Sequence, residues 1–245
     1  REIARSEHQE NRSQISREVK QKVLRRAKRQ IDEESEARLG ELGNRLTERV
    51  VEPLNAMSIG PTMVKSQTSQ ERMTMKVRLA GSMHLGAHTA RPLAMSDSLA
   101  SCQIHESALN NIVAGLELDG KTYSLAELSR HIADKFNAPR QAAVKSENDD
   151  VSITFAQTDA ARIRFDDGRV SIRLSVAKLR QSRRAWADFQ VLVYYRPQAN
   201  GHSVELVRDG VVQLVGRYGF RSQIALRGIF SKTFSKEHPW QVLPK

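Results

Sequence analysis

The chain has 245 residues, 39% of them hydrophobic and 5% aromatic, which is enough to bury a core in one large or two smaller domains. Its single cysteine, Cys102, excludes an intrachain disulfide, and no apolar run approaches the ~20 residues that a membrane-spanning helix needs. The net charge is +11, of which +9 comes from residues 151–245, and this excess favours polyanionic partners such as nucleic acid or anionic lipid.

The N-terminal segment carries an apolar residue at every fourth position from 15 to 31, and the apolar stripe continues to Leu54. This spacing predicts an amphipathic helix over about residues 12–55, with a weak point at Gly40 and Gly43 and an end at Pro53. Its early polar face is basic, and an acidic block at 32–36 follows. Such a helix is compatible with a solvated face, a membrane-surface element or pairing between copies of the chain.

The middle of the chain alternates between strand and helix signals. Alternation over 73–79 predicts a half-buried strand, residues 81–96 could continue a strand pair, and 99–104 reads as another strand. Apolar spacing predicts a helix over Glu106–Leu116 and a second over about 125–136, opened by a capping box between Ser124 and Glu127. Residues 138–150 are the best linker candidate.

The C-terminal part reads as an antiparallel meander. Four Asn-Gly or Asp-Gly dipeptides favour tight turns, and three of them (167–168, 200–201 and 209–210) fall within residues 160–216. Strands are predicted before and after each, with a basic connection at 178–184 and a strand from Trp186 to Tyr195 stopped by Pro197. Helical spacing follows at 222–235.

These elements predict the α+β class, with a long N-terminal amphipathic helix and a curved antiparallel β meander covered by short helices. The expected divisions are residues 1–56 for the helix, 57–145 for mixed strands and two short helices, and 146–245 for the meander and its last helix. Residues 57–245 are expected to form one packed domain.

The strands of the meander separate two kinds of side chain. One face is apolar and would form the wall of a groove for a hydrophobic ligand: Ile163, Phe165, Val170, Ile172, Leu174, Phe189, Val191 and Val193. The arginines expected to contact anionic headgroups or a membrane are Arg162, Arg164, Arg173, Arg183 and Arg184. The sequence indicates no catalytic residue, metal site or cofactor; the pairs His84–His88 and Cys102–His105 lack further ligands and a suitable spacing.

Three segments carry a family resemblance: residues 104–111 (IHESALNN), 207–211 (VRDGV) and 223–236 (QIALRGIFSKTFSK). They resemble an uncharacterised family of bacterial envelope-type proteins, over about residues 60–245. The order of long helix, curved strands and short helix is also similar to the tubular lipid-binding (TULIP-like) proteins. That resemblance implies a curved sheet around a long helix with an apolar tunnel, and it carries no catalytic residue.

The leading expectation is therefore a non-enzymatic domain that binds or transfers lipid, or another hydrophobic ligand, in the bacterial envelope or periplasm. A cytoplasmic location stays open. One alternative is a nucleic-acid-binding module that uses the basic strand face. The other is a helical scaffold or assembly subunit, with a homo-oligomer formed through the N-terminal helix.

Overall fold

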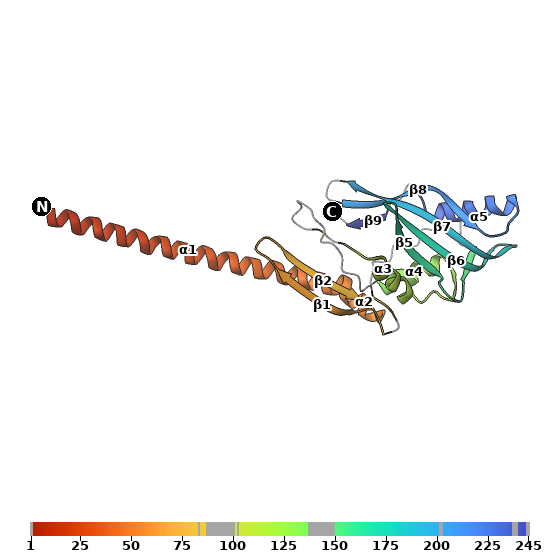
Figure 1. The fold of residues 1–245 in the computed structure, drawn as a ribbon, viewed down its shortest axis with the longest axis horizontal. Helices are drawn as coiled ribbons and strands as arrows, with labels where there is room; N and C mark the ends of the chain where they lie inside the picture. Colours follow the sequence, from red (N-terminus) through yellow and green to blue (C-terminus); the bar gives the residue numbers. More distant parts are fainter. Residues whose placement is uncertain are drawn as a thin grey trace. The chain divides into compact units, whose positions relative to one another are not determined.

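The computed structural model describes residues 2–82, 84–86, 101, 103–136, 150–200, 203–236 and 240–243. The chain divides into two compact units, residues 1–50 and residues 51–245. The second unit, called the β domain below, holds the described strands. The predicted α+β class is confirmed (Figure 1). The predicted linker at 138–149 and most of 81–96 lie outside the described residues.

The first unit is one long helix, α1 (Glu2–Leu46), followed by a π-helical turn at Thr47–Val51. The predicted start at residue 12 and the weak point at Gly40 and Gly43 are wrong. A Cβ added at either glycine would meet nothing within 4 Å, so both face open space, and good helix formers surround them. Helix α2 (Glu52–Ala56) continues past Pro53, because a proline in the first turn of a helix gives up no intrahelical hydrogen bond.

The β domain is built on a seven-stranded antiparallel sheet in the order β3-β4-β6-β7-β8-β9, with β5 also paired to β6. The strands are β3 (Thr122–Ser124), β4 (Val151–Phe155), β5 (Ala161–Asp166), β6 (Arg169–Gln181), β7 (Arg184–Asn200), β8 (Ser203–Val215) and β9 (Trp240–Leu243). Strands β5 to β8 form the predicted meander. β4 and β5 share one edge of β6, since β5 pairs with its first half and β4 with its second.

The turn between β5 and β6 is the one that the sequence predicts. Asp167 and Gly168 have φ angles of 48° and 70°, as a type I′ turn requires. The predicted turn at Asp209-Gly210 is wrong, because β8 runs through both residues. Gly210, whose φ angle is 80°, lies in a β-bulge of β8. At this bulge the pairing register of β8 with β7 shifts, between Leu192 and Tyr194 of β7.

Two other boundaries in the meander also differ from prediction. The basic segment 178–184 is not a connection, since β6 continues to Gln181 and β7 begins at Arg184. Strand β7 passes through Pro197, which pairs with Leu206 of β8. The last β7 residue paired with β6 is Tyr195, so at Pro197 β7 has a neighbouring strand on one side only. Proline is tolerated at such an edge position, because it cannot donate a hydrogen bond to a second neighbour.

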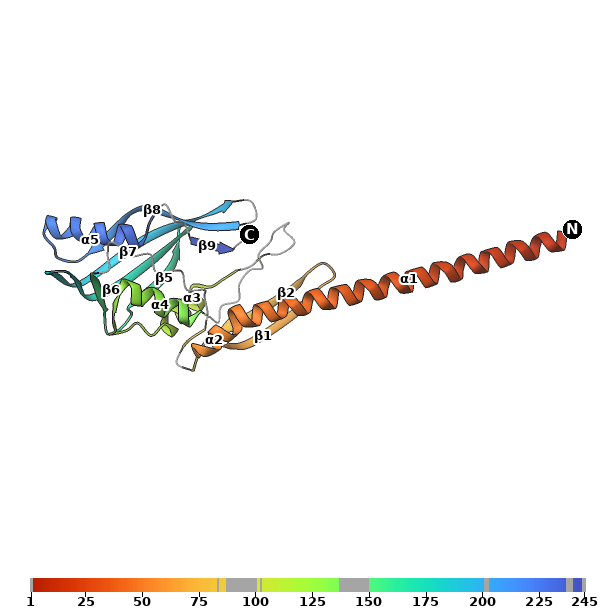
Figure 2. The same cartoon turned by 180° about the vertical axis from the view of Figure 1, so that it is seen from behind.

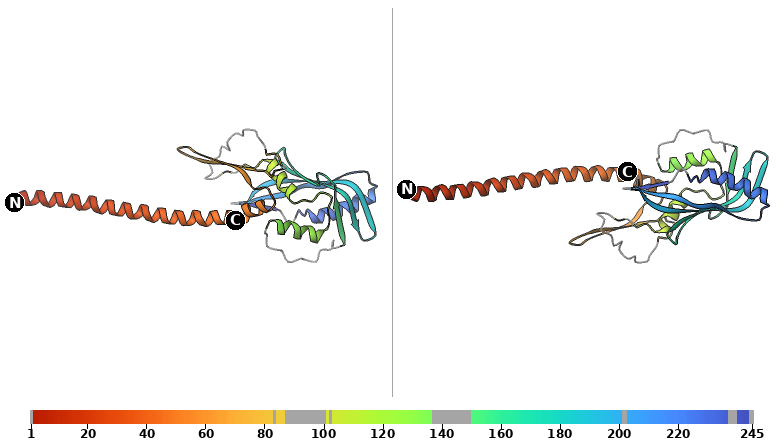
Figure 3. Two further views of the ribbon diagram at one scale, coloured as in Figure 1. Left: turned by 90° about the horizontal axis from the view of Figure 1, so that it is seen from below. Right: turned by 90° about the horizontal axis from the view of Figure 1, so that it is seen from above.

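Three short helices pack on the sheet: α3 (Glu106–Gly115), α4 (Leu125–Lys135) and α5 (Phe220–Thr233). All three were predicted, as was the capping box: the Glu127 N–H donates to the Ser124 hydroxyl and the Ser124 N–H to the Glu127 carboxylate. These bonds hold the pKa of Glu127 below its ordinary value. Figure 3 shows α4 and α5 on the side toward which the strands bend. Leu226 and Phe230 of α5 are fully buried in the core there.

A separate hairpin precedes the sheet, formed by β1 (Pro61–Thr68) and β2 (Met73–Leu79). The sequence predicts β2 but not β1, and the expectation of a half-buried β2 is wrong. Met73 and Met75 are 67% and 60% exposed, because none of the other described strands joins the hairpin. The predicted strand at 99–104 is also wrong, since residues 101, 103 and 104 have no strand structure.

Tyr195 lies in the core of the sheet with 1% of its surface exposed. Burial raises its pKa to about 12, against a smaller lowering by the nearby Arg208 cation. Because the unfolded chain ionises near pH 10, the stability that neutral Tyr195 contributes is complete below pH 10 and is lost between pH 10 and 12. We expect Tyr195→Phe to reduce alkaline destabilisation, measured as urea midpoints from pH 8 to 12. An unchanged pH dependence in this variant would contradict the assignment.

Candidate functional site

The predicted apolar wall lies in the packed interior of the β domain. Ile172, Phe189, Val191 and Val193 are each 9% exposed or less, and α5 covers part of this face, with the Phe230 ring edge-on to Phe189 at 6.1 Å between centroids. Three further members are partly buried against the same core: Ile163, Val170 and Leu174. Phe165 is 42% exposed. All of them except Phe165 therefore pack against protein side chains, and a lipid tunnel along them stays a prediction.

The predicted arginines separate into two groups at opposite ends of β6. Arg162 and Arg173 are directly opposite each other on β5 and β6, and both form ion pairs with Asp159. Their charge is thus partly neutralised within the protein. Arg183 and Arg184 lie at the other end of β6, where the chain turns into β7, and both are exposed. The structure does not bring the five predicted residues together.

More cations gather around Arg183 and Arg184. Lys178 and Arg180 on β6 are exposed and pair with the small residues Ala187 and Ala185 of β7. We call the end of the sheet that holds these residues the basic end. The β6–β7 hairpin contributes four cations to the basic end: Lys178, Arg180, Arg183 and Arg184. Within the part of the chain that the structure describes, no carboxylate lies within ion-pair distance of any of them. Their charge is therefore available to an external anion.

The start of α5 joins this basic end. The Tyr218 hydroxyl donates to the Ala187 carbonyl at 2.7 Å, and the Tyr218 ring packs edge-on to Phe189 at 5.7 Å. These contacts hold the segment between β8 and α5 beside the β6–β7 hairpin, as Figures 1 and 2 show. Exposed Arg217 and Arg221 therefore add to the positive charge here. The N-terminus of α5 adds its dipole, with Gly219 as N-cap and no acid in the first turn.

Two large apolar side chains are exposed among these cations. Phe220 and Ile224 are 77% and 57% exposed, and their spacing of four residues places them on one side of α5. Leu226, Ile229 and Phe230 point from the other side into the core. The outer surface of α5 is thus apolar and flanked by Arg221 and Arg227, a combination typical of helices that lie at a membrane interface.

A pattern in the sequence points to this surface, although the prediction did not use it. The core-facing side of the helix takes up Leu226, Ile229, Phe230 and Phe234. Two further apolar residues of the helix, Phe220 and Ile224, do not lie on that side. Arg217 and Arg221 have the same spacing of four. What the sequence could not provide is the contact of Tyr218 with Ala187, which joins segments 31 residues apart and brings these cations to Arg183 and Arg184.

Of the other candidate residues, His105 has a structural role. His105 caps α3, its Nδ1 accepting from the Ser107 N–H at 2.9 Å, while His88 and Cys102 lie outside the described residues. Among the residues that the structure covers, no three His, Cys, Asp or Glu side chains are grouped to hold a metal ion. No described helix has a stretch that is long and apolar enough to cross a membrane.

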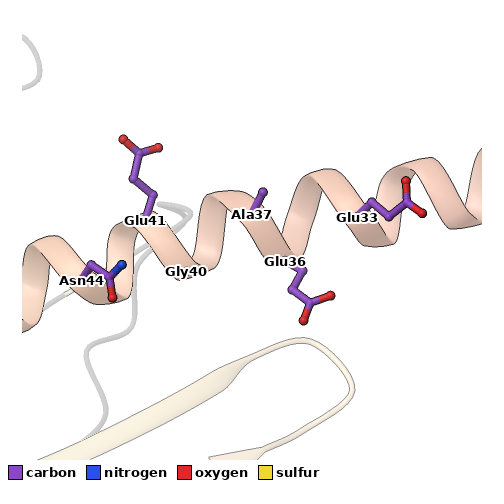
Figure 4. Close-up of a pocket in the computed structure, with 6 residues that line it drawn as sticks. All are labelled: Glu33, Glu36, Ala37, Gly40, Glu41 and Asn44. Carbon is purple, nitrogen blue, oxygen red and sulfur yellow. The ribbon is translucent and has the colours of Figure 1, made fainter.

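A shallow depression also lies on the surface of α1, at the small residues Ala37 and Gly40 (Figure 4). Its other lining residues are polar or acidic: Glu33, Glu36, Glu41 and Asn44. The carboxylates project away from the helix in Figure 4, so this surface does not suit an acyl chain or a phosphate.

Comparison with known proteins adds no relative: no protein-family model, curated protein or solved structure matches the chain. The resemblances drawn from residues 104–111, 207–211 and 223–236 therefore stay predictions.

Proposed function

We propose that the β domain is a non-enzymatic module that binds the surface of anionic lipid membranes through its basic end. The observation that carries this proposal is the exposed pair Phe220 and Ile224, which lies on the outer side of α5 with exposed Arg221 and Arg227. Cations attract an anionic bilayer at about 1 kcal/mol per Lys or Arg near the surface. Phe220 and Ile224 would enter the region between headgroups and acyl chains, and each buried Å² of apolar surface contributes about 25 cal/mol.

This proposal keeps lipid as the ligand but places it at a surface rather than in a tunnel. The predicted tunnel wall is occupied by the protein's own core, including Phe230 of α5. The basic end, by contrast, presents charge and apolar side chains to solvent. An envelope location is part of the same proposal, and recovery of the protein in the membrane fraction of cells would support it.

Cosedimentation with vesicles tests this function directly. We expect the full chain to bind vesicles that contain phosphatidylglycerol and to bind pure phosphatidylcholine vesicles much more weakly. Binding should fall as salt rises, because exposed charges are screened over about 10 Å at 0.1 M ionic strength. A small salt-resistant part should remain from Phe220 and Ile224. Equal binding to both vesicles, or none to either, would contradict the proposal.

Nucleic acid is a second candidate because of one residue on the outer face of the sheet. Tyr194 lies on the side opposite to buried Tyr195, and the Arg169 guanidinium is 4.9 Å from its ring centroid. An aromatic ring beside arginines can stack on a base. The Asp159 ion pairs of Arg162 and Arg173 reduce the charge of this face. Oligonucleotide binding that Tyr194→Ala abolishes would favour this candidate over membranes.

A further inference from the structure

Residues 19–31 of α1 separate two kinds of side chain around the helix. The segment holds six basic residues and no acidic residue, and every side chain in it is exposed. At 3.6 residues per turn, four aliphatic residues lie within about 100° of the helix circumference: Val23, Leu24, Ala27 and Ile31. Five of the cations lie within about 160° on the opposite side: Lys22, Arg25, Arg26, Lys28 and Arg29. Because the two arcs do not overlap, this part of α1 is a basic amphipathic helix.

Both sides of this segment are open. Val23, Leu24 and Ile31 are each 60% exposed or more. Among the described side chains, none of the six cations of the segment lies within ion-pair distance of a carboxylate. The sixth cation, Lys20, lies on the apolar side one turn before Leu24, where its methylene stem can follow the apolar surface while its amine reaches polar groups. The apolar surface and the positive charge are therefore both available to an external partner.

We propose that residues 19–31 of α1 lie on the surface of an anionic lipid bilayer, with their apolar side turned toward the acyl chains. A bilayer meets both sides of the segment, since its anionic headgroups attract the cations and the region below them takes up the aliphatic side chains. Nucleic acid would pair with the cations but would leave the aliphatic side chains in water. A helix also hydrogen-bonds its own backbone, so contact with a bilayer leaves no N–H or C=O group of the segment unpaired.

The acidic block that follows limits the contact. Residues 32–41 hold five acidic residues and one basic residue, and an anionic surface repels them. The contact therefore covers residues 19–31, or ~20 Å of helix. A segment this short binds reversibly, and its binding falls as salt screens the charges. It belongs to a different compact unit from the basic end, so the contact stands whether or not the β domain binds membranes.

Cosedimentation of full-chain variants with phosphatidylglycerol vesicles tests the two sides. Leu24→Gln should weaken binding about fivefold, since it removes apolar area that enters the bilayer. The matched control is Leu39→Gln, which makes the same change at a leucine that is 68% exposed but lies outside the segment, and it should leave binding almost unchanged. Arg26→Gln/Lys28→Gln removes the two cations that flank the apolar side and should weaken binding about tenfold or more. Equal effects of Leu24→Gln and Leu39→Gln would overturn the proposal.

A fluorescent label shows whether the apolar side enters the bilayer. In a Cys102→Ser background, an environment-sensitive label is attached either at Ala27→Cys on the apolar side or at Gln21→Cys on the cationic side, and neither replacement changes the charge of α1. On addition of anionic vesicles, the emission from position 27 should shift to shorter wavelength, while the emission from position 21 should change little. A shift at position 27 that appears without vesicles, as the protein is concentrated, would show that a second copy covers this side and would overturn the proposal.

The same label distinguishes this contact from that of the basic end. In the labelled chain, Arg180→Ala/Arg183→Ala/Arg184→Ala should preserve the shift at position 27 and raise only the lipid concentration that it needs. Vesicle binding without a shift at position 27 would overturn this proposal and leave the basic end as the membrane site. A shift that the triple variant reaches at the same lipid concentration as the natural chain would support the contact of α1 and contradict the function proposed for the basic end. No binding to vesicles at all would overturn both.

Discussion

Replacing Arg180, Arg183 and Arg184 with alanine should reduce the affinity of the protein for anionic vesicles about a hundredfold. Each arginine near a bilayer surface contributes about 1 kcal/mol, and three such losses multiply to that factor. The three residues are exposed on the β6–β7 hairpin, so their removal should leave the melting temperature almost unchanged. Cosedimentation with vesicles of increasing phosphatidylglycerol content measures the effect.

The matched control removes the same charge from the other end of the sheet. Arg162, Arg164 and Arg169 lie on β5 and at the start of β6, away from α5, and their replacement with alanine should change vesicle binding less than about fivefold. If both triple variants lost affinity equally, binding would depend on net charge alone and the basic end would not be a site.

Replacing the exposed apolar pair, Phe220 and Ile224, distinguishes binding to a membrane from binding to other polyanions. Phe220→Ser/Ile224→Ser keeps every cation and removes the side chains that would enter the bilayer. This variant should lose most of its salt-resistant binding to vesicles and should bind heparin as the natural chain does. Equal losses for vesicles and heparin would indicate a general effect on the fold, and an unchanged affinity for vesicles would remove Phe220 and Ile224 from the site.

The features that the sequence predicts correctly are local ones. The capping box at Ser124 and Glu127 needs two residues three positions apart, and the turn at Asp167-Gly168 needs two neighbours that accept positive φ. The inward side of α5 follows from the spacing of Leu226, Ile229 and Phe230. Each signal lies within a few consecutive residues, and at these positions no distant contact overrides it.

The errors arise where a neighbouring strand decides the outcome. Asp209-Gly210 has the composition of a turn, yet pairing with β7 on both sides holds it within β8 as a bulge. Pro197 is accepted in β7 because β6 has already ended. Met73 and Met75 alternate as in a half-covered strand but remain exposed, since alternation predicts an apolar face and not what covers it.

The candidate site could be predicted only in part for the same reason. Arg183 and Arg184 were expected to bind anions, and the structure places them at an exposed hairpin end. Arg217, Arg221 and Phe220 come to that place through the Tyr218–Ala187 hydrogen bond, which no local pattern predicts.

The motif at residues 107–111 has a structural role that composition alone does not reveal. Asn110 of α3 acts as a strand partner for β5: its amide nitrogen donates to the Ile163 carbonyl and its amide oxygen accepts from the Ile163 N–H, both at 2.8 Å. Glu106, one turn earlier, lies 3.4 Å from the Phe165 nitrogen and accepts its N–H. Among the described strands β5 pairs only with β6, so its other edge has backbone groups without a strand partner. Side chains of α3 hydrogen-bond to these groups, which could otherwise pair with another strand.

Asn110→Asp should therefore lower the free energy of unfolding by about 2–4 kcal/mol at pH 7. The replacement turns one donor into an oxygen that faces the Ile163 carbonyl, and it places a charge in a half-buried site. Asn110→Ala loses both bonds without that repulsion, so its loss should be smaller. Protonation of the new carboxyl would restore a donor, and the difference from the natural chain should narrow as the pH falls from 7 toward about 4, where the unfolded chain also takes up the proton.

Urea unfolding at pH 7 and pH 4, together with light scattering, measures these effects. Gln103→Glu is the matched control, because it makes the same amide-to-acid change at an exposed position and should change stability by less than about 0.5 kcal/mol. We expect Asn110→Asp to scatter more light as well, since an unsatisfied β5 edge can pair with another chain. If its stability matched that of Gln103→Glu, the Asn110 bonds would not hold β5, and another contact of α3 would have to close this edge of the sheet.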